Sequence, residues 1–162
     1  MKSERTRMAK LEVGAPAPAF SLSSDDGSVV SSRSLKGQRF VLYFYPADDT
    51  PGCTKEACQF NDLLASFATS NVAVFGVSPD NAAKHQAFRD KYGLGFPLLT
   101  DADKSVMASF GAYGEKKLYG KTVVGVIRST FVIGPKGTIE HAWYGVRADG
   151  HAAKVLRELS NE

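Results

Sequence analysis

Apolar and polar positions divide the first half of the chain into two strands and a helix. Residues 40–45 and 72–77 are apolar at nearly every position, which indicates strands buried on both faces of a sheet. Between them, the apolar side chains Ala57, Phe60, Leu64 and Phe67 recur every three or four residues, the spacing of a helix with one buried stripe. A strand, a helix and a second strand in this order predict the crossover unit of a parallel sheet.

Shorter signals of the same two kinds occupy the rest of the chain. The further elements expected are a hairpin over 19–30 with Asp26-Gly27 at its turn, a helix from Ser78 to Tyr92, a strand over 96–99, a helix from Asp103 to Gly111, strands over 122–127 and 130–133, a turn over 134–137, a strand over 138–143 and a helix over 151–159. The last two strands are joined by a tight turn and so run antiparallel. We therefore expect an α/β fold with a central mixed sheet flanked by helices and an N-terminal β-hairpin. It forms a single domain over 11–162 behind a mobile tail over 1–10.

The composition is that of an ordinary globular domain and excludes several function classes. The 162 residues are 43% hydrophobic and 23% charged, with a net charge of +3. The charges are interspersed and form no basic stripe with interleaved aromatic residues, so nucleic-acid binding is not expected. No apolar stretch approaches the roughly 20 residues that span a bilayer, and no hydrophobic segment follows the charged N-terminus. We expect a cytoplasmic protein with no membrane partner.

The only two cysteines, Cys53 and Cys58, lie at the start of the helix that follows the first apolar run. Thr50 suits the N-cap of this helix and Pro51 its first position, so Cys53 falls in the first turn. Unpaired backbone N–H groups and the helix dipole favour an anion there. An ordinary thiol with a pKa near 8.5 is only about 3% ionised at neutral pH, so this placement favours the reactive thiolate.

Helix geometry separates the two thiols. Five positions along an ideal helix place the Cα atoms of Cys53 and Cys58 roughly 8.6 Å apart, whereas a disulfide needs less than about 7 Å. A reaction cycle that joins both sulfurs must therefore unwind the first turns of the helix.

Two other uses of the cysteines are weaker hypotheses. One short bridge would close too small a loop to stabilise much, and a reducing compartment favours catalytic or redox-sensing thiols over structural ones. Zinc would need further ligands, and none of the histidines His85, His141 and His151 lies at ligand spacing. We expect no metal and no other cofactor.

Arg128 interrupts the last apolar run of the chain, between residues 123–127 and 130–133. Burying a guanidinium costs several kcal/mol unless an anion meets it. Either the strand breaks here and the side chain reaches water, or Arg128 faces the Cys53 thiolate and stabilises it. The sequence alone leaves both open.

Two segments resemble a known family. Residues 44–54 resemble the peroxiredoxin signature Pro-x-x-x-Thr-x-x-Cys, carried here by Pro46, Thr50 and Cys53. Together with residues 125–133, this string is similar to the bacterioferritin comigratory protein, or Q-type, branch of that family. The resemblance runs from about Leu11 to the C-terminus and implies a thioredoxin-like fold.

The resemblance also implies an activity, the thiol-dependent reduction of hydrogen peroxide and organic hydroperoxides. Cys53 would be the peroxidatic nucleophile, and its sulfenic acid would condense with Cys58, the resolving thiol, to an intramolecular disulfide. A dithiol reductant such as thioredoxin would reopen that bond. The same pattern suggests a monomer.

Supporting roles follow for three more residues by the same resemblance. Arg128 matches the family's active-site arginine, which favours the hypothesis that it faces Cys53. Thr50 would direct its hydroxyl toward thiolate and peroxide, in competition with its cap bond, and Pro46 would shield the sulfur from water. Glu56 agrees with the family string, but as an exposed helix acid it receives no role.

Two alternative functions use the same residues. A disulfide oxidoreductase acting on proteins would suit a thiol at a helix start, although such enzymes usually separate their cysteines by two residues rather than the four found here. A non-catalytic redox sensor would use Cys53 oxidation only as a switch. Turnover with peroxide and a reductant distinguishes a peroxidase from a sensor.

Overall fold

The computed structural model describes residues 10–160, so the tail expected over residues 1–10 lies outside the described residues except for Lys10. The strands are β1 (Ser21–Ser24), β2 (Val29–Ser31), β3 (Arg39–Phe44), β4 (Val72–Ser78), β5 (Leu98–Thr100), β6 (Tyr113–Leu118), β7 (Lys121–Val126), β8 (Ser129–Ile133) and β9 (Ile139–Tyr144). The helices are α2 (Pro51–Asp62), α3 (Leu64–Thr69), α4 (Ala82–Tyr92), α5 (Ser105–Ser109) and α6 (His151–Ser160). No described helix is long and apolar enough to cross a membrane.

The central sheet is mixed, as the sequence predicts. It has seven strands in the order β2-β1-β5-β4-β3-β8-β9. The strand pairs β3 and β4, and β4 and β5, are parallel. The strand β8 runs antiparallel to both β3 and β9, and β1 runs antiparallel to both β2 and β5. The expected crossover through α2 and the expected N-terminal hairpin are both confirmed.

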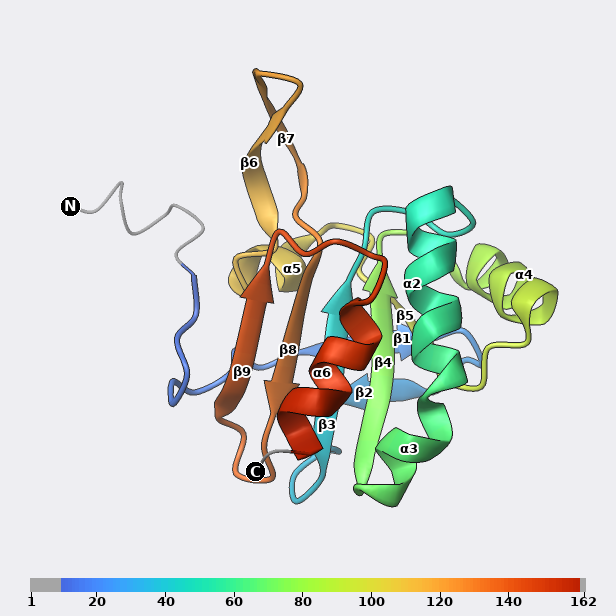
Figure 1. Cartoon of the computed structure of the whole chain (residues 1–162), viewed down its shortest axis with the longest axis vertical. Coiled ribbons are helices and arrows are strands. Elements are labelled where there is room, and N and C mark those ends of the chain that lie inside the picture. Colours follow the sequence, from blue (N-terminus) through green and yellow to red (C-terminus); the bar gives the residue numbers. More distant parts are fainter. Residues whose placement is uncertain (1–9, 161–162) are drawn as a thin grey trace.

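Hydrophobic cores cover both faces of the sheet, which explains the continuous apolar run of β3. Val41 and Tyr43 belong to the core beneath α2 and α6, whereas Leu42 and Phe44 belong to the core beneath α5. Successive side chains of a strand point to opposite faces of the sheet. A strand with a hydrophobic core on each face is therefore apolar at nearly every position. Figure 1 shows α2 and α6 in front of the sheet, where they contact each other.

The helix expected to continue to Phe67 is broken at Leu63. The N–H of Leu63 bonds to the carbonyls of both Gln59 and Phe60, which tightens the last turn of α2 and ends it. The shorter helix α3 then restarts and buries Phe67. The apolar spacing is that of one helix, but the change of direction lets the second part follow the core.

Helix starts differ from the expected ones by a few residues. The strand β4 runs through Ser78, and α4 begins after Asn81, whose side chain accepts a hydrogen bond from the N–H of Lys84. At α5, the carboxylate of Asp103 accepts from the N–H of Ser105, and that of Asp101 accepts from the next two N–H groups. Asp, Asn and Ser satisfy free N–H groups equally well, so neighbouring candidates in a sequence are hard to rank.

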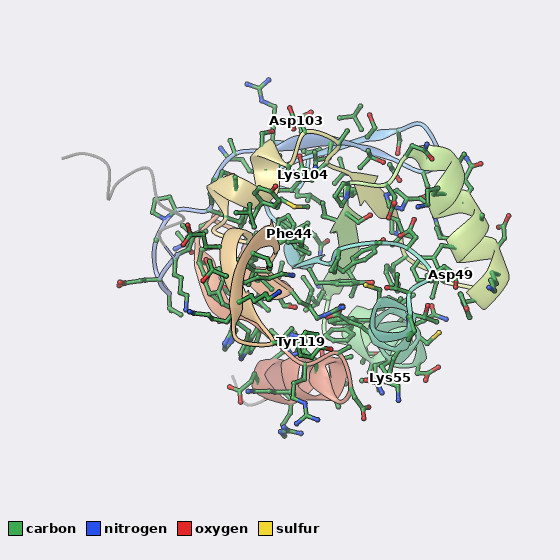
Figure 2. All side chains as sticks on the ribbon, turned by 90° about the horizontal axis from the view of Figure 1, so that it is seen from above. Phe44, Asp49, Lys55, Asp103, Lys104 and Tyr119 are labelled. Atoms are coloured by element: carbon green, nitrogen blue, oxygen red, sulfur yellow. The ribbon has the colours of Figure 1, made fainter. Side chains whose placement is uncertain are left out.

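The strand expected over 122–127 pairs outside the main sheet. It is β7, and it forms a separate two-stranded ribbon with β6, an element that the sequence does not predict. The segment of β6 is rich in charge rather than apolar, because the ribbon projects from the sheet (Figure 1). Figure 2 labels Tyr119 in the connection between its strands, where the side chain is 96% exposed.

Candidate active site

The candidate active site lies where β3 ends and α2 begins. The chain leaves β3 at Phe44, crosses residues 45–50 and enters α2 at Pro51. The start of α2 therefore lies at the carboxyl end of a central parallel strand, the edge at which open α/β sheets bind ligands. Figure 2 looks down on the molecule from above and labels Asp49 in this loop and Lys55 in the first turns of α2.

Thr50 is the N-cap residue of α2, as expected, but its hydroxyl makes a different bond. Its backbone is extended and its carbonyl accepts the first helical hydrogen bond, from the N–H of Thr54 at 2.8 Å. The hydroxyl donates to the carbonyl of Ala47 at 3.2 Å, so the expected cap bond is replaced by a bond inside the loop. Because this uses its one hydrogen, the Thr50 hydroxyl can only accept a hydrogen bond from a molecule in the site.

Cys53 lies in the first turn of α2, is only 2% exposed, and faces Arg128. Nη2 of Arg128 donates to Sγ of Cys53 at 3.3 Å. The chain does leave strand conformation at Arg128, between β7 and β8. Its side chain does not extend into water, however, because only 17% of it is exposed. A guanidinium hydrogen bond and a helix N-terminus both stabilise a thiolate relative to a thiol.

Gly52 makes room for this contact. A Cβ atom at this position would lie 3.3 Å from Nη2 of Arg128, closer than nearly all Cβ contacts in proteins. The small residue before Cys53 therefore allows the guanidinium to approach the sulfur across the helix end.

Glu56 is the functional residue that the sequence analysis misses. The expectation of an exposed helix acid is wrong: Glu56 is fully buried, and its Oε1 accepts a hydrogen bond from Nη1 of Arg128 at 2.5 Å. Burial raises the pKa of Glu56 to about 7, although the charge and hydrogen bond of Arg128 lower it. Among the described residues, its Oε2 finds no hydrogen-bond partner. Two signals were available: the three-residue spacing from Cys53, which shares a helix face, and the anion that a buried Arg128 requires.

One guanidinium thus serves two acids. Burial lowers the pKa of Arg128, but the charges of Glu56 and Cys53 outweigh it, and the pKa lies above its ordinary value. If Glu56 keeps its proton, the positive charge of Arg128 balances the Cys53 thiolate alone. If Glu56 is ionised, the two acids compete for the same charge.

Cys58 lies on the same uninterrupted helix as Cys53, and both thiols are free. Cys58 is partly buried, and burial, together with the nearby charge of Asp62, raises its pKa. In this conformation a smaller fraction of Cys58 is ionised than of an ordinary thiol at the same pH. Unwinding of α2 would let it approach the Cys53 sulfur and would also remove it from this environment.

Pro46 lies in the same loop as Thr50 and is exposed. The structure thus brings Cys53 and Arg128 into contact, and places Pro46 and Thr50 in the loop that leads to the sulfur. The shielding role of Pro46 stays a prediction.

Known proteins resemble this chain over nearly its whole length. Residues 13–142 match the AhpC/TSA family. The chain is 41% identical over 151 residues to peroxiredoxin Bcp of Bacillus subtilis, covering 93% of this chain and 94% of that protein. It is 40% identical over 152 residues to peroxiredoxin Bcp of Escherichia coli, covering 94% and 97%.

A solved structure agrees in the same way. The bacterioferritin comigratory protein of Xanthomonas campestris, studied for alkyl peroxide reduction, superposes with a TM-score of 0.85 at 38% identity, covering 93% of this chain and 98% of that one. The likeness confirms the thioredoxin-like fold implied by the signature. The contact between Cys53 and Arg128 lies at a helix start that carries the family signature. The chain therefore belongs to the AhpC/TSA family, among the bacterioferritin comigratory, or Q-type, peroxiredoxins.

Proposed function

We propose that the chain is a thiol peroxidase that reduces hydrogen peroxide and organic hydroperoxides through Cys53 and Cys58. The observation that carries the proposal is the buried Cys53 sulfur at a helix N-terminus, 3.3 Å from the guanidinium of Arg128. The second thiol of the same helix supplies the resolving group. Membership of the peroxiredoxin family supports both assignments.

The first step is a displacement at oxygen. The Cys53 thiolate attacks one peroxide oxygen, the O–O bond breaks, and the electron pair of that bond leaves on the other oxygen, which takes a proton and departs as water or alcohol. Arg128 stabilises both the thiolate and the charge that develops on the oxygens. Thr50 accepts a hydrogen bond from the peroxide O–H, because its own hydrogen is held by Ala47. Pro46 limits access of water to the sulfur.

The second step joins the two sulfurs. The Cys58 thiolate attacks Sγ of the Cys53 sulfenic acid, forming the disulfide and releasing the sulfenic oxygen as water after protonation. Helix geometry keeps the sulfurs too far apart, so the first turns of α2 unwind before this step. Unwinding exposes Cys58 to water, which reverses the burial that raises its pKa.

A dithiol protein then returns the enzyme to its starting state. One of its thiolates attacks the Cys53-Cys58 disulfide, and its second thiol releases the reduced enzyme. We assign this role to thioredoxin, acting on a monomer in the cytoplasm, where thiols are kept reduced. Glutaredoxin is the competing reductant, and a reconstituted assay with each reductase system separates the two.

The decisive experiment mixes the reduced protein with hydrogen peroxide in a stopped-flow instrument. Wild type consumes peroxide, Cys53→Ser consumes none, and Cys58→Ser reacts once and accumulates a sulfenic acid that a dimedone probe traps. Robust turnover by Cys53→Ser would overturn the assignment. Both variants change one atom, so circular dichroism of each provides the folding control.

Two additions to this experiment, a dithiol reductant and separately a scrambled protein substrate, separate the alternatives. A redox sensor oxidises once and does not cycle with a reductant. A disulfide oxidoreductase reduces or transfers disulfides to a scrambled protein substrate while consuming peroxide no faster than an ordinary thiol. A peroxidase shows rapid, repeated peroxide consumption and no such transfer.

A further inference from the structure

A buried hydrogen-bond network joins the active-site loop to α4. Asp48 lies in the loop, and its side chain is only 2% exposed. Its Oδ1 accepts a hydrogen bond from the hydroxyl of Tyr45 at 2.6 Å, and its Oδ2 lies 2.6 Å from Nδ1 of His85, which α4 supplies fully buried. On the other side of the ring, Nε2 of His85 lies 3.1 Å from the carbonyl oxygen of Leu99.

Elementary hydrogen-bond accounting fixes the protons of this network. The carbonyl of Leu99 can only accept, so Nε2 of His85 carries a hydrogen. The Tyr45 hydroxyl uses its hydrogen on Asp48, and a distance of 2.6 Å between Oδ2 and Nδ1 needs a further hydrogen between them. Asp48 and His85 therefore share one proton, as an ion pair or as two neutral groups. In either state the pair has no net charge, which suits a site closed to water.

The loop is held at Asp48 and passes that constraint to Thr50. The backbone N–H of Asp48 donates to Oδ2 of Asp80 at 2.7 Å, so main chain and side chain are both fixed. The carbonyl of the preceding residue, Ala47, accepts the hydroxyl hydrogen of Thr50. A chain of contacts thus runs from α4 through Asp48 to the threonine that faces the substrate in the proposed reaction.

A second tie in the same loop acts in the same direction. Asp49 has a left-handed backbone, with φ of 60°, and its carboxylate accepts hydrogen bonds from Lys91 and Tyr92 at the end of α4. These groups are exposed and contribute little. Asp80 is paired with Lys84 at 3.0 Å, so its charge is balanced on the outer side of the network. The buried Asp48 and His85 contact is the tie that water does not weaken.

We propose that Asp48 and His85 are positioning residues for peroxide reduction, which hold the Ala47 carbonyl and hence Thr50 in the geometry that receives the peroxide. Both residues act through the loop and not directly on the Cys53 sulfur. Thiolate formation depends on Arg128 and the helix start, whereas reaction with peroxide depends in addition on the loop. The proposal rests on the peroxidase function proposed above.

Two reagents that react with the same sulfur test the proposal. Peroxide needs the positioned loop, whereas iodoacetamide needs only the thiolate. We expect Asp48→Ala to lower the second-order rate of Cys53 oxidation by about tenfold or more, and to leave the rate of alkylation by iodoacetamide within about twofold of wild type. Both rates are measured in a Cys58→Ser background, so that the second thiol contributes to neither.

A conservative variant provides the rescue. In Asp48→Asn, the amide oxygen accepts from Tyr45 and the amide N–H donates to a neutral Nδ1 of His85, so both bonds persist. We expect its peroxide rate to stay within about threefold of wild type. Asp90→Asn, at an exposed carboxylate of the same helix α4, is the matched control and leaves both rates unchanged.

Three outcomes would overturn the positioning role. Asp48→Ala reacting with peroxide as fast as the parent would do so, as would equal losses in both rates, or Asp48→Asn losing as much as Asp48→Ala. If Asp48→Ala does not fold, His85→Gln keeps an N–H donor for the carbonyl of Leu99 but removes the hydrogen bond to Asp48, and an unchanged peroxide rate there would decide against the role. A parent protein that does not react with peroxide would instead overturn the peroxidase function itself.

Discussion

The buried carboxyl of Glu56 accepts a hydrogen bond from Nη1 of Arg128 at 2.5 Å, while Nη2 of the same guanidinium donates to the Cys53 sulfur. Arg128 is therefore held from within the protein rather than by solvent. A cation fixed in this way costs no reorganisation when charge develops in the transition state.

Removal of the guanidinium should abolish most of the peroxidase activity. We expect Arg128→Met to lower the second-order rate with hydrogen peroxide by about a hundredfold or more, because the thiolate loses its cation and the leaving oxygen its hydrogen-bond donor. The rate is measured by stopped flow on the reduced protein. Arg33→Met, in the turn after β2, is the control. A rate within about threefold of wild type in Arg128→Met would show that the contact is structural only.

Gly52 separates activity from stability. In Gly52→Ala the new Cβ would lie 3.3 Å from Nη2 of Arg128, so the guanidinium must shift by a few tenths of an ångström in the region where it contacts the sulfur. We expect the peroxide rate to fall by about tenfold. The free energy of unfolding should not fall in parallel, because alanine is favoured over glycine in a helix by up to about 1 kcal/mol. Urea unfolding and stopped-flow kinetics measure the two effects, with Lys55→Ala, at an exposed position of α2, as the control.

Glu56 should make the protein less stable as the pH rises. The pKa of Glu56 is about 7 in the folded protein, compared with 4.5 for an unperturbed glutamate, the value taken for the unfolded chain. Between pH 4.5 and 7 the folded protein therefore binds a proton that the unfolded chain has lost. The free energy of unfolding therefore decreases by up to about 1.4 kcal/mol per pH unit from this group, and the effect ends above pH 7.

His151 contributes the opposite slope over nearly the same range. Burial, with the charges of Lys154 and Arg128, lowers its pKa to about 4 from 6.5, so the unfolded chain binds a proton that the folded protein does not. Its contribution to stability is present above pH 6.5 and is lost as the pH falls toward 4. Between pH 4.5 and 6.5 the decrease in the free energy of unfolding caused by Glu56 and the increase caused by His151 largely cancel as the pH rises.

Substitution of Glu56 should isolate its pH dependence from that of His151, because the His151 contribution is the same in variant and parent. We expect the stability difference between Glu56→Gln and its parent to change by about 1 kcal/mol per pH unit between pH 5 and 6.5, in favour of the variant as the pH rises. Urea unfolding is measured in a Cys53→Ser background, so that thiol ionisation does not contribute. A difference that does not vary with pH would show that Glu56 has an ordinary pKa.

Oxidation should unwind α2 only up to Gln59. The side chain of Gln59 donates to Asp149 at 2.7 Å and accepts from the N–H of Gly150 at 2.8 Å, which fixes the helix to the start of α6. Two residues later, Asn61 bonds to the main chain of the loop after α4. We expect amide exchange to lose protection over residues 54–58, whose N–H groups bond within the helix, in the disulfide form and to keep it beyond.

The Gln59 contacts provide a variant for this boundary. Gln59→Ala should extend the unprotected region by about one turn and speed disulfide formation after peroxide addition. Hydrogen exchange with mass spectrometry resolves both forms, and Lys55→Ala serves again as control. Equal protection of residues 51–60 in the reduced and oxidised proteins would show that the disulfide forms without unwinding.

Short-range sequence patterns were enough to predict the strand and the helix start that form the candidate active site. The apolar run of β3, the N-cap position of Thr50 and the first-turn position of Cys53 depend on neighbours within a few residues, so their patterns are visible in one dimension. The signature carried by Pro46, Thr50 and Cys53 added the family, and the structure agrees with that fold.

Tertiary structure decided which distant groups meet. Arg128 and Cys53 are 75 positions apart, and Asp48 and His85 are 37 apart. Glu56 can be buried because Arg128, in the connection between β7 and β8, lies against its face of α2 and donates a hydrogen bond to it. Burial and charge balance depend on packing that periodicity does not encode. The sequence therefore placed Cys53 at the helix start, whereas only the fold showed that Arg128 and Glu56 lie beside it.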